Sequence, residues 1–425
     1  MSQHDAPSPL SPHEPLAEDE MCTMPLSVHA DPADWPAPVR ALGRVPGPQP
    51  PTTAPPLAEL TTLRVGGPVG RYVEAAGEAE LIDVVRQADA EGRPLLVIGG
   101  GSNILAADAG FDGVVVRDAR TEVELVSDSA CGGVQITATA GATWDDLVRR
   151  AVASHWGGFA PLSGIPGTVG AAPVQNIGAY GTEVAELLAS VRAWDRAAGR
   201  TVHIPLSELR LTYRDSALKR SLTDPDVGAG RTWGPTGRWV VLSATFHVRQ
   251  ASLSAPIAYR QLAGALGVDM GARVDAREVR EAVLALRRSK GMVLDADDHD
   301  TWSAGSFFTN PILTRAAAAA LPEDAPRFPV TDHTRVVAGV QDAPIVDGLV
   351  KTSAAWLIDH AGFPKGFAAP GASGRARLST RHVLALTNRG GATAADVAAL
   401  RDTIVAGVRE RFGITLVPEP VAVGW

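Results

Sequence analysis

The sequence contains only 2 cysteines among its 425 residues. A disulfide framework is therefore excluded, and a reduced, cytoplasmic compartment is expected. Cys22 falls in a polar N-terminal segment and Cys131 in a polar linker, so neither fits the electropositive setting of a reactive thiol. No apolar run approaches the length of a transmembrane helix, and the first residues lack the basic and apolar regions of a signal peptide, so no membrane partner is expected.

Other signatures are also missing. The 10 histidines are scattered without the spacing of metal ligands, so no metal site is expected. No Gly-x-Ser-x-Gly elbow of a serine hydrolase is present. A formal net charge of −8 argues against nucleic acid as a partner.

The charge is unevenly distributed, since residues 1–56 hold 7 acidic and 2 basic side chains among many prolines. Such a segment has too little apolar surface to offset its ordering entropy, and we expect a disordered or loosely attached extension. Only residues 21–26 and 39–42 are apolar enough to dock elsewhere.

The remaining chain is long enough for two or more domains. Residues 78–91 have a helical apolar face, and the apolar run 95–98 after them ends at glycines, which predicts a β-α-β unit with parallel strands. Further strands are expected at 111–117, 122–126, 133–140, 188–195, 201–205 and 239–249. A helix is expected after Thr143, which would be its N-cap. Residues 223–238 are expected to form a surface insertion. From residue 251 helices dominate, at 275–288, 316–321, 353–361 and 394–412, with a buried strand at 383–388. We therefore expect one domain at 57–250 and a second at 251–425.

A long stretch at residues 161–181 has glycines at 164, 167, 170, 178 and 181 and no charged side chain. Neither a helix nor a strand would keep so many glycines. Its polar side chains can form hydrogen bonds without carrying charge, which suits a large, flat, partly polar ligand. The alternative is a tightly packed segment between two domains.

Residues 99–103, Gly-Gly-Gly-Ser-Asn, follow the apolar run and could form a nest of main-chain N–H groups for a pyrophosphate. The dinucleotide fingerprint fails because Ile104 stands where its third glycine belongs. A glycine-rich hairpin is the alternative.

Three further clusters are candidates for chemistry. The Arg214 guanidinium in Tyr-Arg-Asp-Ser (213–216) could bind a carboxylate through two hydrogen bonds, or form a surface ion pair. Residues 303–311 combine two phenylalanines with Ser306 and Asn310, which fits an apolar wall or an ordinary buried turn. Glu419 lies between two prolines, either in a rigid surface turn or as a carboxylate held in place for use.

Together these stretches resemble the UDP-N-acetylenolpyruvoylglucosamine reductases, also called UDP-N-acetylmuramate dehydrogenases, flavoenzymes of peptidoglycan precursor synthesis. The resemblance covers residues 57–421 and rests on TTLRVGGP, GGGSN, GIPGTVGAAPVQNIGAYG, YRDS, GSFFTNP and PE, in the order of the family. It implies an α+β chain, with a two-part FAD-binding domain of the vanillyl-alcohol-oxidase (PCMH) type followed by an α+β substrate-binding domain.

The resemblance implies non-covalent FAD, NADPH as the hydride-donating co-substrate and UDP-N-acetylglucosamine enolpyruvate as the acceptor. The residues it assigns to the cofactor are Gly99, Gly100, Gly101, Ser102, Asn103, Ser163, Ile165, Gly167, Gly170, Gln175, Asn176, Gly178 and Tyr180. Close approach of the cofactor would explain the glycines, because a Cβ would hold the chain away.

Catalysis is assigned by the resemblance to three residues outside the glycine-rich stretches. Arg214 would stabilise the enolate-like charge that develops when the enol ether accepts a hydride. Glu419 would act together with the arginine, and Ser306 would donate the proton to the α-carbon.

Substrate contacts are carried over to Tyr259, Lys290 and Asn310, and the tyrosine indicates the branch of the family that has this loop. Gly291-Met292 departs from the usual pattern after the lysine, and His360 stands where a glutamine is common. His360 therefore contacts substrate or caps its helix. A monomer is expected.

Two other functions remain open from sequence. A flavin oxidase of the same broad fold would often tether its flavin through histidine or cysteine, and neither occurs in 99–103 or 161–181. A non-catalytic flavin or nucleotide-sugar binding protein would not need Arg214, Ser306 and Glu419.

Overall fold

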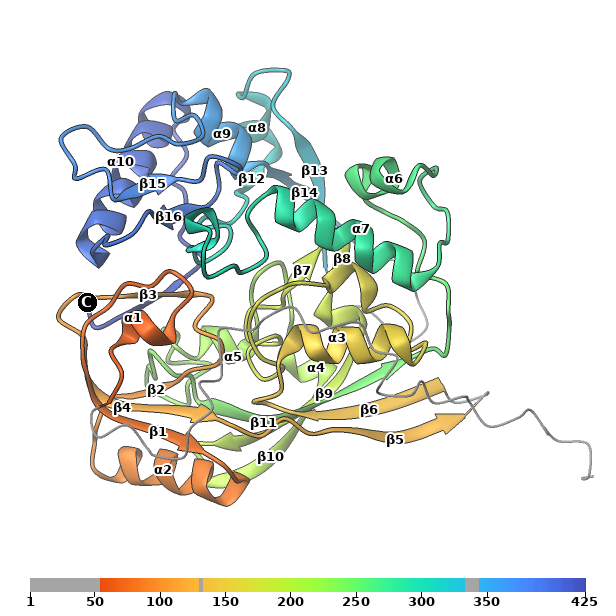
Figure 1. Cartoon of the computed structure of the whole chain (residues 1–425), viewed down its shortest axis with the longest axis vertical. Helices are drawn as coiled ribbons and strands as arrows, with labels where there is room; N and C mark the ends of the chain where they lie inside the picture. Colours follow the sequence, from red (N-terminus) through yellow and green to blue (C-terminus); the bar gives the residue numbers. More distant parts are fainter. Residues whose placement is uncertain (1–53, 130–132, 333–343) are drawn as a thin grey trace, which may run out of the picture.

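The computed structural model describes residues 54–129, 133–332 and 344–425 (Figure 1). Cys22, Cys131 and the extension up to residue 53, including its two apolar segments, lie outside this range. Among the helices of the described residues, none is both long and apolar enough to cross a membrane.

The first sheet is parallel and is built from β1 (Val69–Ala75), β2 (Leu95–Val97) and β4 (Phe111–Asp118). Helix α2 (Glu78–Ala90) packs on it through Leu81, Val84, Val85 and Ala88, the apolar face read from the sequence. The predicted parallel β-α-β unit is confirmed. Its two strands are not neighbours, however, because β4 lies between them in the order β1-β4-β2.

The second sheet is antiparallel, in the order β10-β9-β11-β6-β5. Its strands are β5 (Val123–Ser129), β6 (Gly133–Thr139), β9 (Leu188–Asp195), β10 (Arg200–Pro205) and β11 (Trp239–Val248), close to the predicted ranges. Helix α3 (Trp144–Ala153) begins after Thr143 as predicted, but the Thr143 side chain forms no capping hydrogen bond.

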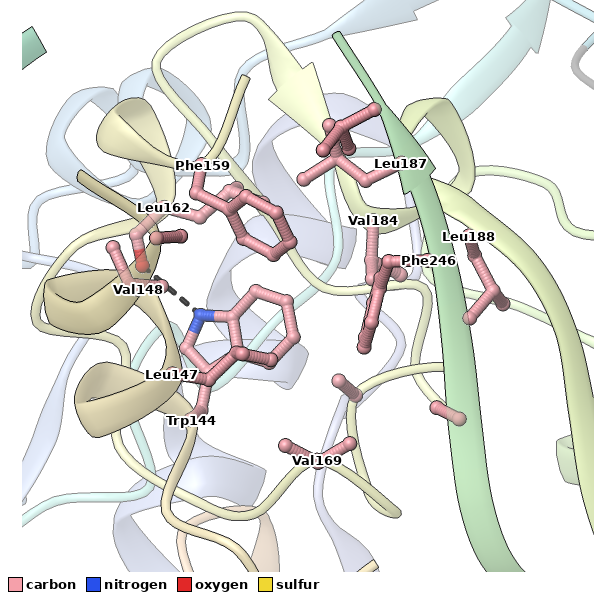
Figure 2. Close-up of a cluster of buried hydrophobic side chains, with 14 of the residues drawn as sticks. Trp144, Leu147, Val148, Phe159, Leu162, Val169, Val184, Leu187, Leu188 and Phe246 are labelled. Atoms are coloured by element: carbon pink, nitrogen blue, oxygen red, sulfur yellow. Dashed lines mark hydrogen bonds between the residues drawn. The ribbon is translucent and has the colours of Figure 1, made fainter. Parts of the chain in front are cut away.

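The core between α3 and this sheet is aromatic at its centre (Figure 2). The rings of Trp144, Phe159 and Phe246 lie 5.5–6.2 Å apart in tilted and edge-to-face arrangements. The Trp144 indole donates to the Leu162 carbonyl at 3.1 Å. This bond fixes the start of the glycine-rich stretch against the helix, because Leu162 is the second residue of the stretch.

Helices α6 (Arg260–Leu266) and α7 (Ala276–Ser289) follow the second sheet. Leu262, Val279 and Val283 belong to the same core as Trp144. The change in composition near residue 251 therefore does not coincide with a change of core, since α6 and α7 pack in the same core as α3 and the second sheet.

The C-terminal core surrounds α9 (Ala354–His360) and α10 (Ala394–Phe412), which lie at the upper left of Figure 1. Leu63 and Val65, from the start of the described chain, also belong to it. The remaining elements here are β12 (Ile312–Thr314), α8 (Arg315–Ala319), β13 (Arg327–Thr331), β14 (Ile345–Thr352), β15 (Ala376–Leu378) and β16 (Leu386–Asn388).

The C-terminal end of the chain pairs with the N-terminal half of the fold through two short parallel strands, β3 (Ile104–Ala106) and β17 (Val421–Val423). This pair links the segment after the glycine turn to the segment after Glu419. Short elements elsewhere are α1 (Leu57–Leu60), β7 (Gly178–Ala179), β8 (Thr182–Glu183), α4 (Leu206–Leu209) and α5 (Ala217–Arg220).

Candidate functional site

Three of the predicted clusters meet through main-chain hydrogen bonds. The Glu419 N–H donates to the Phe307 carbonyl at 2.9 Å, and the Val421 N–H donates to the Asn103 carbonyl at 2.9 Å. The Asn103 amide also donates to the Glu419 carbonyl at 3.4 Å. Glu419 is thus held between the glycine turn and the Ser306–Phe307 segment, in place of the free surface turn that was the alternative.

Arg214 brings in the fourth cluster. Its guanidinium donates to the carbonyls of Asn176 at 3.1 Å and Gly178 at 2.7 Å, and its Nε lies 3.6 Å from Glu419 Oε1. Arg214 has a φ of 56°, a left-handed conformation that is uncommon outside glycine. The arginine is therefore fixed by main-chain acceptors while its Nε edge faces the carboxylate.

The Asn176 side chain supports this arrangement through three hydrogen bonds. Its amide nitrogen donates to Glu183 Oε2 at 2.7 Å and to the Thr212 carbonyl at 2.8 Å, and its oxygen accepts from the Ala185 N–H at 3.3 Å. The side chain is fully buried. Its donors and its acceptor already have partners in the protein, so Asn176 orients the loop around Arg214.

A pocket opens beside this meeting point. It is lined by Gly99, Gly100, Gly101, Ser102, Asn103, Gly170 and Gln175 among the residues predicted for the cofactor. Ser163, Ile165, Gly167, Asn176, Gly178 and Tyr180 do not line it. The pocket also has apolar walls from β2, the residue after it and β11, through Leu96, Ile98, Val240 and Val241.

The polar groups of the pocket have unused hydrogen-bonding capacity. Within the described residues, the main-chain N–H groups of residues 99–103 donate to no acceptor. The buried Gln175 Nε2 also lacks a partner there, while its oxygen accepts from Lys219 Nζ at 2.8 Å. Burial lowers the pKa of Lys219, against the opposing effect of the Glu419 and Asp215 carboxylates. Unpaired donors beside a cation and apolar walls fit the phosphates and the flat rings of FAD.

The glycines of the turn are required by the protein's own chain. A Cβ on Gly101 would lie 1.9 Å from the Leu60 carbonyl oxygen, and one on Gly100 would lie 2.8 Å from the Gly167 Cα. A Cβ on Gly99 would meet Thr168 Oγ1 at 2.6 Å. The close approach predicted from the sequence is present, but for these residues the partner is neighbouring main chain and the Thr168 side chain.

A second group of predicted residues lies where α6 and α7 meet the glycine-rich stretch. The rings of Tyr180 and Tyr259 meet edge to face at 5.5 Å, and Lys290 Nζ lies 5.8 Å from the Tyr180 ring centre. Lys290 also donates to Gln261 Oε1 at 2.6 Å. Burial, then the nearby Arg287, lowers the pKa of Lys290. Tyr259 is exposed, so this edge is open to a ligand.

Ser306 and Asn310 flank the two buried phenylalanines. Within the part of the chain that is described, the Ser306 hydroxyl makes no hydrogen bond. Asn310 Oδ1 accepts a hydrogen bond from the Ala354 N–H at 2.9 Å. The main-chain N–H of Asn310 donates to the Tyr213 hydroxyl at 3.4 Å. Asn310 therefore connects the start of α9 to the Tyr213–Arg214 pair.

His360 is engaged at the end of α9. Its ring stacks on Trp356 with centres 3.9 Å apart, and Nδ1 lies 2.9 Å from the Trp356 carbonyl. Of the two readings of His360, this geometry supports helix capping.

Several charged residues of the site gave no signal in the sequence. Lys219 lies in the pocket, and Lys351 of β14 places its Nζ 4.5 Å from the Tyr213 ring centre. Arg287 of α7 is half-buried and donates to the Met292 carbonyl at 2.8 Å, and its buried Nε has no partner among the described residues. Only the amphipathic pattern of α7 could have pointed to Arg287, as a charged residue on a buried face.

Comparison with known proteins agrees with this arrangement. Residues 69–205 match a family model described as an FAD binding domain. Residues 297–423 match the model described as the C-terminal domain of UDP-N-acetylenolpyruvoylglucosamine reductase. The fold class predicted from the sequence is thereby confirmed.

Relatives and a solved structure extend the match over most of the chain. A UDP-N-acetylenolpyruvoylglucosamine reductase of Nocardia farcinica is 52% identical over 368 residues, covering 87% of this chain and 88% of the relative. One of Cutibacterium acnes is 48% identical over 369 residues, covering 87% and 89%. The crystal structure of the reductase from Thermus caldophilus shares the fold, with a TM-score of 0.52, 22% identity and coverage of 86% and 97%. The chain belongs to the UDP-N-acetylenolpyruvoylglucosamine reductase family.

Proposed function

We propose that the chain catalyses the NADPH-dependent, FAD-mediated reduction of UDP-N-acetylglucosamine enolpyruvate to UDP-N-acetylmuramate in peptidoglycan precursor synthesis. The observation that carries this proposal is the position of Arg214 and Glu419. The two side chains lie 3.6 Å apart, next to Ser306–Phe307 and to a turn of unused main-chain donors. Membership in the reductase family supports the same conclusion.

FAD would be held without a covalent bond by the turn at 99–103, with Gly170, Gln175 and Lys219 completing the pocket. When bound, FAD accepts a hydride from NADPH and supplies a hydride to the enol ether. Ser163, Ile165, Gly167, Gly178 and Tyr180 would shape the loop that carries these residues. Asn176, assigned to the cofactor from sequence, would act by holding this loop and Arg214.

Arg214 would stabilise the negative charge that spreads into the substrate carboxylate. A guanidinium is always protonated, and here it is anchored by two carbonyls, so it needs no reorganisation as charge develops. Glu419 would hold the Nε edge of the guanidinium in its orientation.

Ser306 would give the proton to the α-carbon. Its hydroxyl is not committed to another group among the described residues, so it can point toward the substrate. A serine hydroxyl is a weak acid, so this role requires polarisation of the hydroxyl by neighbouring groups.

The diphosphate of the substrate would bind at the α6–α7 edge. Tyr259 and Lys290 offer a hydroxyl and an ammonium there. Asn310 would contribute through its free amide nitrogen, because its oxygen is committed to Ala354.

A three-part division of the chain, with an extension at 1–56, an FAD-binding domain at 57–250 and a substrate domain at 251–425, remains part of this proposal. So do the cytoplasmic location and a monomeric state. Size-exclusion chromatography with light scattering tests the last of these.

The test is an absorbance spectrum of purified protein, followed by anaerobic NADPH and then the UDP substrate. We expect a flavin spectrum that NADPH bleaches and that the UDP substrate restores. Denatured protein should release all of its flavin to the supernatant. A flavin that NADPH does not bleach, or that only oxygen restores, would contradict the proposal.

A further inference from the structure

The motif TTLRVGGP (residues 61–68) has no role in the proposed function, although its second threonine lies between two parts of the site. The Thr62 N–H donates to the carbonyl of Gly101, in the turn at 99–103, at 3.2 Å. The Thr62 hydroxyl donates to the Ser303 carbonyl at 2.7 Å. Only 2% of Thr62 is exposed, so water does not compete for this hydroxyl.

The chain around Thr62 is held on its other side by the C-terminal core. Leu63 is fully buried in that core, and the Asn388 amide donates to the carbonyls of Leu63 at 3.2 Å and Arg64 at 3.0 Å. The Arg64 guanidinium lies 3.9 Å from the Trp302 ring centre. The Thr62 hydroxyl therefore projects from a well-anchored stretch of chain and has a fixed position relative to the turn.

Ser306 lies on a short segment, residues 303–307, that Thr62 fixes at one end. At the other end the Phe307 N–H donates to the Leu384 carbonyl at 2.7 Å. Between the two ends, Gly305 has a φ of 73°, and a Cβ there would meet no atom of the described chain within 4 Å. The middle of the segment is therefore less constrained than its ends.

The segment also has room to move. A cavity of about 30 Å³ is lined by Thr62, Ser303 and Gly305, among other residues. If the bond from the Thr62 hydroxyl were lost, the segment could shift into this space, and Ser306 would move with it.

The reduction of an enol ether requires a hydride at one carbon and a proton at the neighbouring α-carbon. In the proposed function, the hydride is delivered from the pocket beside the turn at 99–103, and the proton comes from Ser306. A reacting group that is misplaced by about 1 Å can slow a reaction about hundredfold. The distance between the turn and the 303–307 segment therefore has to be maintained.

We infer that Thr62 is a positioning residue, whose hydroxyl holds the 303–307 segment at a fixed distance from the turn at 99–103 and so keeps the proton donor in place. This inference rests on the proposed function, since it requires Ser306 to deliver the proton. The alternative is that the hydroxyl only stabilises the fold, as a buried hydrogen bond does.

The first test removes the hydroxyl and keeps nearly the same shape. In Thr62→Val, reoxidation of the NADPH-reduced holoenzyme by the UDP substrate should be about fivefold slower, and reduction by NADPH should stay within about twofold of wild type. The solvent deuterium isotope effect on reoxidation should rise, because proton delivery becomes the slower step. Thr62→Ser keeps the hydroxyl and should restore both values.

A double-mutant cycle with Ser306→Ala separates positioning from stability. If Thr62 acts through Ser306, adding Thr62→Val to Ser306→Ala should slow reoxidation by less than about twofold further. A further slowing as large as in the wild-type background, or equal slowing of both half-reactions by Thr62→Val, would overturn the inference.

Thr61→Val is the matched control. Thr61 is a buried neighbour, 1% exposed, and its hydroxyl donates to the Val65 carbonyl of its own loop at 3.4 Å. Both half-reactions should stay near the wild-type rates, and a slowing of reoxidation equal to that of Thr62→Val would argue against the inference. If Thr62→Val does not fold, Thr62→Ala removes the same hydroxyl and is judged by the same criteria.

Amide hydrogen exchange separates this inference from the proposed function. Peptides that cover residues 303–307 should exchange faster in Thr62→Val than in wild type or Thr61→Val, and unchanged exchange would overturn the inference whatever the activity. If wild-type protein does not reduce the UDP substrate, the proposed function fails, and the exchange rates still decide whether Thr62 fixes the segment.

Discussion

The turn at 99–103 and the Arg214–Glu419 pair lie next to each other but are built in different ways. The turn offers main-chain N–H groups, and its shape depends on close contacts of Gly100 with Gly167 and of Gly101 with Leu60. The pair consists of charged side chains from segments 205 positions apart, aligned by the carbonyls of Asn176 and Gly178. The shape of the turn therefore depends on glycines, which have no Cβ. The geometry of the pair depends on two particular charged side chains.

This difference predicts that substitutions in the turn act on folding, whereas substitutions in the charged region act on turnover. The following experiments test this separation, beginning with the largest expected effect.

Gly101→Ala should lower the free energy of unfolding by about 3 kcal/mol or more, because left-handed strain adds to a clash with the Leu60 carbonyl. Gly267→Ala is the matched control, since Gly267 has a similar φ of 67° and open space at its Cβ. It should lose only about 1 to 2 kcal/mol. Denaturant unfolding measures both, and equal losses would show that strain alone matters.

Arg214→Met should raise the barrier of substrate reduction by more than about 2 kcal/mol, through loss of a charge-assisted donor in a site shielded from water. NADPH oxidation without the UDP substrate should change little. Arg220→Met provides the control, because Arg220 pairs with Asp215 and does not line the pocket. Stopped-flow measurement of the two half-reactions tests this, and similar effects of both variants would remove the special role of Arg214.

His382 should make folding depend on pH. Burial, with Lys290, Lys365 and Arg287 nearby, lowers the pKa of His382 to about 4 from an ordinary value of 6.5. In the unfolded chain the His382 imidazole is protonated below about pH 6.5, whereas in the folded chain it is protonated only below about pH 4. Stability should therefore fall as the pH falls through this window, by about 2 kcal/mol after allowance for partial exposure.

The comparison with His382→Gln isolates this effect, since glutamine cannot titrate. Denaturant unfolding at pH 7 and pH 4.5 should show a smaller loss of stability in the variant. Parallel losses in the two proteins would assign the pH dependence to other groups.

Ser306→Ala should slow substrate reduction about tenfold, less than the roughly hundredfold minimum usual for a general acid, because a serine hydroxyl is a weak acid. The rate of NADPH oxidation and the melting temperature should stay near wild type, because the hydroxyl supports no hydrogen bond among the described residues. Ser289→Ala, on the exposed end of α7, is the control. A fall in both half-reactions would argue against proton donation.

Deletion of residues 1–50 should have the smallest effect. Their acidic, proline-rich composition predicts no contribution to either region, so melting temperature and turnover should be unchanged. A clear drop in melting temperature on differential scanning calorimetry would show that the segment docks.

Local patterns predicted many of the elements well. The apolar face of α2 and the limits of β9 and α10 could be read from periodicity and capping residues. The four clusters were visible as glycine-rich or charged stretches, and the structure brings them together. Their meeting depends on long-range pairs such as Asn103 with Glu419, which sequence spacing does not encode.

The rest could not be predicted because it depends on what each residue faces. The glycines of the turn were expected to allow close approach of a cofactor. In the structure a Cβ at Gly101 or Gly100 would also clash with the main chain of Leu60 or Gly167. Lys219 and Lys351 lie in stretches of ordinary composition. Leu222 and Thr236 flank a loop that looks solvent-exposed, and only the anchoring of Trp233 turns its ends inward.

The parallel pairing of β3 with β17 has a consequence for biosynthesis. Asn103 leaves the ribosome long before Glu419. More than three hundred further residues are synthesised before the turn at 99–103 can contact Glu419. A nascent chain that stops before β17 would lack both the strand that fixes Glu419 and the glutamate itself. Such incomplete translation products would also lack Val421, which lines the pocket, and would therefore be unable to complete the reaction.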